Sequence, residues 1–249
     1  MKPLELYLHI PFCIQKCNYC DFLSAPSCAG ERKVYVESLC QKIRSYKDLA
    51  KAYHVVSIFV GGGTPSLLLS KQIEQIFEAV REIFVIDSDA EISLEANPGT
   101  VTEEKLQAYR NCGINRLSIG LQSAKDRELK RLGRIHTYEE FLWTYELARK
   151  AGFLNINVDL MSGIPLQTLA DWEETLHEVA RLKPEHISAY SLIMEEGTPF
   201  YERYGNGKHL EELPDEETER KMYYRTREIL ESYGYHRYEI SNYARLGYE

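Results

Sequence analysis

The feature that most constrains the fold is a regular alternation of strand-like and helix-like segments along the 249 residues. Six segments are rich in β-branched and aromatic residues and are bounded by turn-forming residues, a pattern typical of strands. They span residues 4–10, 55–60, 90–95, 116–121, 155–160 and 186–193. Because strands and helices alternate without interruption, we expect parallel strands joined by right-handed crossovers.

The segments between these strands have the composition and punctuation of helices. They span residues 31–52, 70–84, 102–112, 138–151 and 169–182, and a last helix is predicted over 216–233. Ser70 and Thr102 are predicted N-caps, and Gly113 and Gly152 stand where glycine commonly ends a helix.

Such elements fit either an open doubly wound sheet or a closed or partly closed barrel. Several strands end in polar or glycine-rich sequences, among them HIPFC, VGGGTP, LEANPG, GLQS, DLMSGIP and SLIMEEGTP. Barrels gather functional groups at the carboxyl ends of many strands, whereas an open sheet concentrates them near one switch point. The sequence therefore favours an α/β fold with a partial TIM-type (β/α)6 barrel.

The domain prediction follows from this pattern and from the length. We expect a core barrel over residues 1–195, because about 250 residues suit one large domain. Residues 196–249 are more polar and turn-rich, and are predicted to form a connecting segment and a terminal helix. The chain is expected to be a fragment that stops before a C-terminal domain.

Composition narrows the class of function and the compartment. A net charge of −8 argues against nucleic-acid binding as the main role, because phosphates require a basic face. Glu5 and His9 interrupt the apolar N-terminal segment, which is unlike a signal peptide, and no segment approaches the roughly 18 apolar residues of a membrane span. A cytoplasmic protein without stable membrane insertion is predicted, in which clustered thiols stay reduced and bind metal or do chemistry.

Cys13, Cys17 and Cys20 form a C-x3-C-x2-C motif directly after the first predicted strand. Three thiolates on one loop can converge on a single metal centre. A structural zinc site would need a fourth ligand from Cys28, His9 or Asp21. A disulfide with one free thiol is disfavoured by the compartment. A [4Fe–4S] cluster ordinarily takes four cysteines, so three would leave one iron open to another ligand. Spacing alone leaves the cluster, zinc and incidental packing as alternatives.

A second motif, GGGTP at residues 61–65, ends the second predicted strand. Consecutive glycines let the backbone come close to a ligand, although a phosphate cradle or a tight turn fits equally well. Together with the cysteine loop, this motif resembles the radical S-adenosylmethionine (SAM) family. In that family C-x3-C-x2-C holds a [4Fe–4S] cluster, and SAM chelates the fourth iron through its amino and carboxylate groups.

The resemblance extends to the branch that contains oxygen-independent coproporphyrinogen III oxidase (HemN) and the heme chaperones (HemW). It is carried along nearly the whole chain by YLHIPFCIQKCNYCDF, FVGGGTPS, SLEANPGT, RLSIGLQS, VDLMSGIP and AYSLIMEEGTPFY. The resemblance implies that Cys13, Cys17 and Cys20 are the cluster ligands. It implies the following SAM-binding positions: Tyr7, Tyr19, Gly62, Gly63, Thr64, Glu95, Gln122, Arg134, Asp159 and Ile193.

The implied roles differ in kind. Gly62, Gly63 and Thr64 would present backbone to the methionine end of SAM, with Thr64 equally explained as an N-cap or turn hydroxyl. Glu95 would bond a ribose or an ammonium group, or form an ion pair at the barrel rim. Arg134 suits a bidentate carboxylate clamp. Ile193 would contact the nucleoside through its backbone. His9 could be a metal or heme ligand, but it is expected to pack and to form hydrogen bonds in the strand that seats the cysteine loop.

Two functions from different classes follow from the resemblance, with a zinc-stabilised binding module as a third reading. A heme chaperone would bind heme or porphyrin and deliver it to recipient hemoproteins. An oxidase would decarboxylate coproporphyrinogen III by radical chemistry in porphyrin biosynthesis. The oxidase pattern has a cysteine where this chain has Phe22, and a longer arm before Tyr7, so the chaperone is favoured and enzymatic activity stays open.

Overall fold

The computed structural model describes residues 1–249 as an α/β fold with a mostly parallel sheet. The chain forms two compact units. The first comprises Met1–Gln15, Leu23–Leu117 and Thr144–Leu154, and the second comprises Lys16–Phe22, Ser118–Trp143 and Asn155–Glu249. The chain passes from one unit to the other within strand β6 (Arg116–Gln122) and within helix α6 (Tyr138–Lys150).

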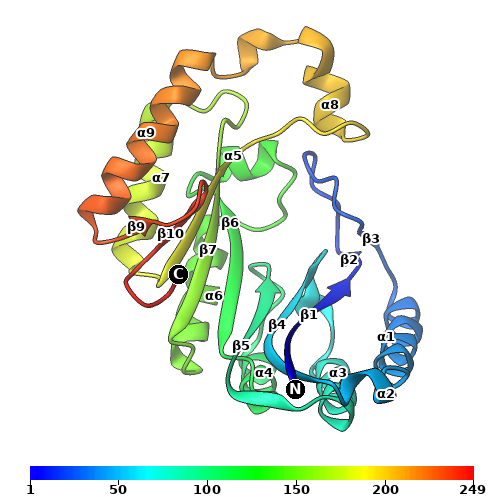
Figure 1. Ribbon diagram of the computed structural model, residues 1–249. Helices are drawn as coiled ribbons and strands as arrows, with labels where there is room; N and C mark the ends of the chain where they lie inside the picture. Colours follow the sequence, from blue (N-terminus) through cyan, green and yellow to red (C-terminus); the bar gives the residue numbers. More distant parts are fainter. The chain divides into compact units, whose positions relative to one another are not determined.

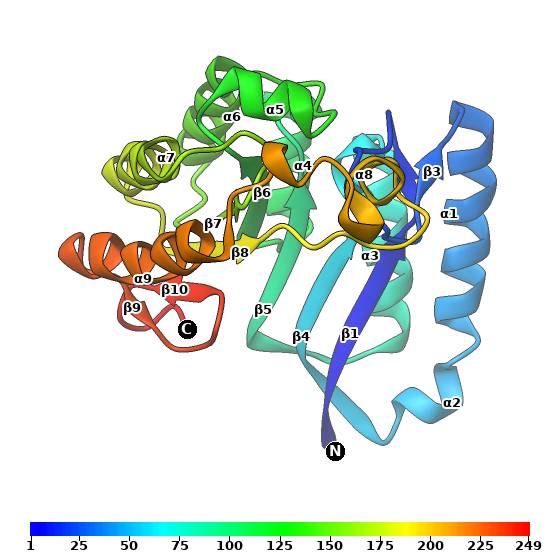
Figure 2. The same cartoon turned by 90° about the horizontal axis from the view of Figure 1, so that it is seen from above.

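The first unit is built on three parallel strands, β1 (Lys2–Ile10), β4 (Tyr53–Gly62) and β5 (Ile86–Ala96), which lie side by side in Figure 2. A short parallel pair, β2 (Phe12–Cys13) and β3 (Ala25–Pro26), follows β1. The helices are α1 (Ala29–Arg44), α2 (Lys47–Ala50), the 3-10 turn η1 (Pro65–Leu67), α3 (Ser70–Ile83) and α4 (Glu103–Asn111).

Helix α3 shows how the sequence produces this packing. Its buried side chains Ile73, Ile76, Phe77 and Val80 recur at intervals of three and four residues, which places them on one helix face. Helix α1 packs against α3, and α3 packs against α4. This apolar face of α3 is therefore buried in the interior of the first unit.

The second unit contains most of β6, followed by β7 (Asn155–Ser162), β8 (His186–Ser191), β9 (His236–Arg237) and β10 (Asn242–Ala244). Strands β7 and β8 are parallel, while β10 runs antiparallel to both β8 and β9 (Figure 1). The helices are α5 (Asp126–Arg131), α7 (Leu169–Leu182), α8 (Pro199–Tyr204), the 3-10 turns η2 (Gly205–Gly207) and η3 (Leu210–Glu212), and α9 (Glu216–Ser232).

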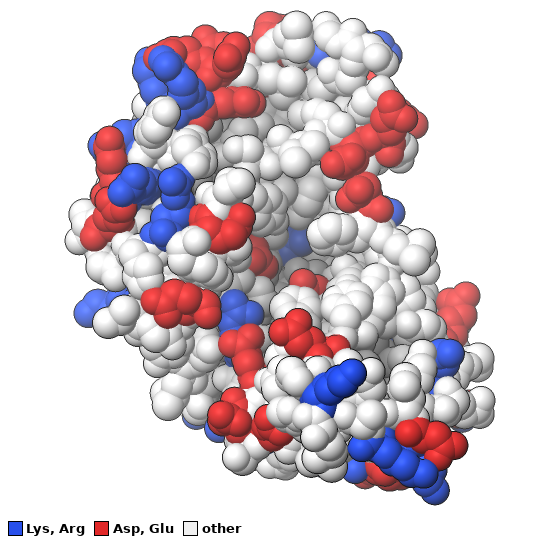
Figure 3. All heavy atoms as spheres, viewed as in Figure 1, with Lys and Arg blue, Asp and Glu red and all other residues white.

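Helix α9 packs against α7 with one face and carries charges on the other. The buried Trp172 of α7 donates its indole N–H to the Thr226 hydroxyl of α9 at 2.9 Å. On the exposed face, Arg225 pairs with Glu228 and Arg227 pairs with Glu231, and Figure 3 shows acidic and basic side chains interspersed there. The predicted last helix is therefore confirmed as α9, and it is amphipathic.

The alternation of strands and helices is confirmed, with local corrections. The predicted helix 31–52 is wrong as one element, because α1 ends at Arg44 and a separate turn forms α2. Ser70 is the first residue of α3 and not its N-cap, since the Gln72 side chain accepts the Leu69 N–H. Thr102 is confirmed as an N-cap, accepting the Lys105 N–H at 3.2 Å.

The glycine predictions are confirmed by left-handed φ angles of +79° at Gly113 and +87° at Gly152. The sequence pattern missed α5, α8 and the short strands β2, β3, β9 and β10. None of the helices has the length and apolar character to cross a membrane. The predicted domain boundary at residue 195 stays a prediction.

Candidate cofactor site

The three-cysteine loop leaves β1 through β2 and is shared between the two units. Cys13 belongs to the first unit, and Cys17 and Cys20 belong to the second. All three are partly buried and carry free thiols.

In the first unit, the GGGTP motif is bonded to the start of the cysteine loop. The Gly63 N–H donates to the Ile10 carbonyl at 2.8 Å, and the Thr64 N–H donates to the Phe12 carbonyl at 2.7 Å. A Cβ atom on Gly63 would lie 2.6 Å from the Phe12 carbonyl oxygen. Glycine is required at this position because the two backbone segments approach so closely.

The Thr64 side chain reaches the first cysteine. Its hydroxyl lies 3.6 Å from Cys13 Sγ as a donor, and it accepts the Asn97 side-chain N–H at 2.9 Å. Thr64 is buried, so this hydroxyl has a fixed orientation. The sequence around Asn97 does not indicate this role, because the Asn-Pro pair that contains it indicates only a turn.

Glu95, at the end of β5, accepts the Gly62 N–H at 3.0 Å through Oε2. Gly62 has a φ of +118°, which favours glycine, and a Cβ there would lie 2.6 Å from the His9 ring. The carboxylate thus fixes the backbone of the glycine motif. Burial, together with the nearby Glu95 charge, raises the pKa of Tyr7.

Tyr7 and His9 of β1 hold the exit of the cysteine loop. The His9 Nε2 lies 2.9 Å from the Leu23 carbonyl and must donate to it, so Nδ1 accepts the Tyr7 hydroxyl at 3.0 Å in the neutral ring. The Tyr7 ring stacks on Phe59 at 6.1 Å between centroids. Both nitrogens of His9 are engaged, which leaves it unsuited to be a zinc ligand in this arrangement.

In the second unit, Asn18 fastens the segment Lys16–Phe22 by three hydrogen bonds. Its N–H donates to the Leu132 carbonyl at 2.9 Å, and its side-chain amide donates to the Arg131 carbonyl at 2.9 Å. Its own carbonyl accepts the Phe200 N–H, from α8, at 3.0 Å. Cys17 and Cys20 are therefore held against the end of α5 and the start of α8. No sequence motif indicates this role for Asn18.

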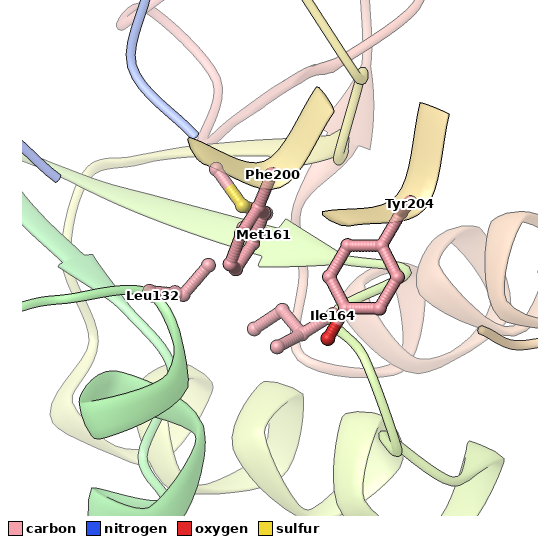
Figure 4. Close-up of a cluster of buried hydrophobic side chains, with 5 residues drawn as sticks. All are labelled: Leu132, Met161, Ile164, Phe200 and Tyr204. Atoms are coloured by element: carbon pink, nitrogen blue, oxygen red, sulfur yellow. The ribbon is translucent and has the colours of Figure 1, made fainter. Parts of the chain in front are cut away.

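An apolar cluster supports this docking (Figure 4). Phe200 and Tyr204 of α8 point toward Leu132, Met161 and Ile164, all buried. Tyr19, between the second and third cysteines, and Tyr190 of β8 pack against the same cluster. Helix α8 thus contributes to the position of the cysteine segment.

Arg134 is placed beside the second cysteine. Its guanidinium lies 3.8 Å from Cys17 Sγ through one nitrogen and donates to the Gly120 carbonyl at 2.6 Å through the other. Burial raises the pKa of Tyr19, an effect that Arg134 opposes and the Cys17 sulfur reinforces. Arg134 therefore places a cationic hydrogen-bond donor next to the Cys17 sulfur.

Gln122 is the last residue of β6, whereas Asp159 lies within β7, three residues before that strand ends at Ser162. Gln122 is buried with a φ of +77°, a strained conformation for a residue with a side chain, and it accepts the Tyr190 hydroxyl at 2.7 Å. Asp159 accepts the side-chain N–H of Asn157 at 2.7 Å and the Ser118 hydroxyl at 3.2 Å. Ile193 follows the end of β8, and its side chain is exposed.

The structure thus groups the predicted residues by unit. The first unit contains Tyr7, Cys13, Gly62, Gly63, Thr64 and Glu95. The second unit contains Cys17, Tyr19, Cys20, Gln122, Arg134, Asp159 and Ile193. In the first unit, hydrogen bonds connect the glycine motif after β4 to the start of the cysteine loop. In the second unit, the Arg134 side chain bridges Cys17 and the Gly120 carbonyl of β6. The assignment of the predicted residues as ligands of a cofactor stays a prediction.

The donor set fits an iron–sulfur cluster. It consists of three free thiols, with a hydroxyl donor near Cys13 and a guanidinium donor near Cys17. Hydrogen bonds to the sulfurs are a usual feature of iron–sulfur ligation and tune the reduction potential of the cluster.

The sequence of this chain is similar to those of known proteins along its whole length. The sequence model of the radical SAM superfamily matches residues 7–179. The heme chaperone HemW of Escherichia coli is 39% identical over 251 residues, an alignment that covers 100% of this chain and 65% of that protein. HemW of Bacillus subtilis is 37% identical, with 98% of this chain and 64% of that protein covered. The chain therefore spans about two thirds of the length of these curated relatives.

Among solved structures, coproporphyrinogen III oxidase (HemN) from Escherichia coli, described as a radical SAM enzyme, matches with a TM-score of 0.89. The two sequences are 30% identical, and the match covers 99% of this chain and 56% of that chain. The predicted α/β partial barrel is confirmed by this likeness. The sequence motifs that suggested the resemblance and the whole-chain comparisons therefore agree.

Proposed function

Because the chain belongs to the radical SAM superfamily, we propose that it is a heme chaperone of the HemW kind that holds a [4Fe–4S] cluster and SAM. The observation that carries the proposal is the 39% identity to HemW of Escherichia coli along the whole chain. HemN of the same organism is 30% identical over 99% of the chain. The proposal includes a cytoplasmic location and delivery of heme to recipient hemoproteins.

Phe22 adds support to this choice. The resemblance assigns a cysteine to this position in the oxidase branch, and phenylalanine cannot ligate iron. The Phe22 side chain is exposed, while its carbonyl accepts the Lys16 ammonium at 3.0 Å. In the proposed protein the segment Lys16–Phe22 therefore provides two thiols, Cys17 and Cys20, and no further ligand.

In the proposed protein, Cys13, Cys17 and Cys20 hold the cluster, which supplies one-electron chemistry and an iron open to SAM when bound. Thr64 and Arg134 donate toward the sulfurs of Cys13 and Cys17 and help to orient them. The Gly62–Glu95 hydrogen bond keeps the glycine motif in its left-handed turn. Asp159 and Gln122 offer polar groups for the ribose or the ammonium of SAM.

The proposal is tested with the natural protein, expressed from its gene and reconstituted anaerobically with iron and sulfide. Heme is titrated by absorbance, and transfer to an apo-hemoprotein is followed by recovery of its spectrum. Decarboxylation of coproporphyrinogen III is assayed in parallel, with HemN of Escherichia coli as the positive control and HemW of the same organism as the matched negative control.

We expect saturable heme binding, transfer to the apo-hemoprotein and no carbon dioxide release above the HemW control. Decarboxylation at a rate comparable to HemN would overturn the chaperone proposal and favour the oxidase. Failure to bind heme, with the cluster intact, would overturn it as well.

A further inference from the structure

A continuous chain of hydrogen bonds runs through the second unit from an exposed tyrosine to Asp159. Tyr238 follows β9, and its hydroxyl lies 2.8 Å from His186 Nε2. His186 of β8 is buried, and its Nδ1 lies 2.6 Å from the Asn157 side-chain oxygen. Asn157 of β7, also buried, donates its amide to Asp159 Oδ1 at 2.7 Å.

The direction of every bond follows from the carboxylate at the inner end. An ionised carboxylate only accepts, so the Asn157 Nδ2 must face Asp159 and its Oδ1 must face His186. The amide oxygen also only accepts, so His186 Nδ1 carries the proton. In a neutral imidazole Nε2 is then unprotonated and accepts the Tyr238 hydroxyl.

Two serines complete the arrangement around Asn157. Ser188 donates its hydroxyl to the Asn157 amide oxygen at 3.1 Å, which adds a second donor to that oxygen. Ser118 accepts an Asn157 amide proton at 2.7 Å and donates its own proton to Asp159 Oδ2 at 3.2 Å. Both oxygens of Asp159 therefore receive a donor, and Asn157 can turn neither way without losing several bonds.

We propose that Tyr238, His186 and Asn157 form a positioning relay that fixes the Asp159 carboxylate in one orientation toward bound SAM. The inference rests on the proposed function, because that function makes Asp159 a SAM contact. The relay residues do not touch SAM in this proposal. They act through Asp159, which is partly exposed and is the last residue in this series of hydrogen bonds.

The relay depends on the hairpin of β9 and β10, which the sequence pattern did not predict. The hairpin of β9 and β10 joins β8 in antiparallel fashion, and the Ala189 N–H donates to the Ser241 carbonyl at 2.7 Å. This pairing brings Tyr238 to His186, with their rings 5.7 Å apart and nearly edge-to-face. The hairpin lies outside the residues that the superfamily model matches, which end at 179.

The test measures SAM affinity by equilibrium dialysis on cluster-reconstituted protein, with iron content and unfolding temperature determined for each variant. Tyr238→Phe removes only the hydroxyl, and His186→Gln removes the donor to Asn157. Each is expected to raise the Kd about 3- to 10-fold, the effect of losing one hydrogen bond. His186→Asn keeps a donor near the Nδ1 position and is expected to retain more affinity than His186→Gln.

Three further variants show how these affinity changes arise. Asp159→Asn is expected to raise the Kd by about 10- to 100-fold, because it removes a charged acceptor. Tyr224→Phe is the matched control, since this exposed tyrosine of α9 lies outside the relay, and its Kd should equal that of the unaltered protein. In His186→Asn, the added Tyr238→Phe change should have no further effect, because the link between them is already broken.

A readout without SAM tests the direction of the relay. Nitrogen-15 NMR of His186 should show a neutral ring with Nδ1 protonated. A ring protonated at Nε2, or unchanged SAM affinity in Tyr238→Phe and His186→Gln while Asp159→Asn is impaired, would overturn the relay. Unchanged affinity in Asp159→Asn would instead overturn the SAM contact of the proposed function, and the relay toward SAM with it.

Discussion

Replacement of Gly63 by alanine tests the close contact between the glycine motif and the cysteine loop. A Cβ at this position would lie 2.6 Å from the Phe12 carbonyl oxygen, 2.9 Å from its nitrogen and 3.0 Å from its carbonyl carbon. These are backbone atoms, so no side-chain rotation relieves the overlap. The segments must separate by about 0.8 Å to reach the roughly 3.4 Å of an ordinary non-bonded contact.

Two routes are open to the variant, and their costs are similar. If the segments stay together, overpacking costs about 1–3 kcal/mol of unfolding free energy. If they separate, the Gly63 bond to Ile10 and the Thr64 bond to Phe12 are weakened, at about 0.5–1.5 kcal/mol each. Separation also moves Thr64 away from Cys13, so we expect slower cluster incorporation as well as lower stability.

The assay combines urea unfolding of the apo-protein with iron and sulfide analysis after reconstitution. Gly30→Ala is the matched control, because a Cβ there meets only the Cys28 sulfur at 3.8 Å, an ordinary contact. Because Gly30 lies in the first turn of α1, we expect Gly30→Ala to be as stable as the unaltered protein or more stable by up to about 1 kcal/mol, and to take up iron normally. If Gly63→Ala is equally stable and takes up iron normally, the argument from close backbone approach is refuted.

Three further predictions concern the second unit. Arg134→Lys cannot bridge the Cys17 sulfur and the Gly120 carbonyl, so the cluster should be lost faster to an iron chelator; an unchanged rate would contradict the role of the guanidinium. Asn18→Ala removes the bond to the Arg131 carbonyl, worth about 1 kcal/mol, and should speed alkylation of Cys17 and Cys20 in the apo-protein, whereas equal rates would argue against docking by Asn18. Burial, followed by the Arg134 charge, lowers the pKa of His136 from 6.5 to about 3, so the unfolded chain binds the proton first. Stability should therefore fall by about 1.4 kcal/mol per pH unit from this group as pH drops below 6.5, and His136→Asn should remove that slope while the exposed control His209→Gln retains it.

The sequence predicts the strands well because runs of β-branched residues between turn-forming residues have few alternative secondary structures. The limits appear where one residue or one contact decides. Ser70 looks like an N-cap, yet Leu69 occupies that place because the Gln72 side chain supplies the bond. The short hairpin of β9 and β10 forms through pairing with β8, a non-local contact that no local pattern contains.

The sequence also predicts only part of the candidate site. Cysteine spacing and glycine motifs identify chemistry that requires particular residue types, so Cys13 and Gly63 stand out in the sequence. Asn18, Asn97 and Asn157 do not, because their roles depend on partners distant along the chain. The period of two in β8, with His186, Ser188 and Tyr190 on one face, is the pattern that would have indicated an inward polar row.

The most direct test of the central claim is Mössbauer spectroscopy of protein reconstituted with iron-57, recorded with and without SAM. Three cysteine ligands leave one iron of a cubane open, so we predict about four irons per chain and a changed signal from about one of them when SAM is added. A cluster whose irons are all insensitive to SAM, or a single tightly bound zinc that iron cannot replace, would contradict the claim.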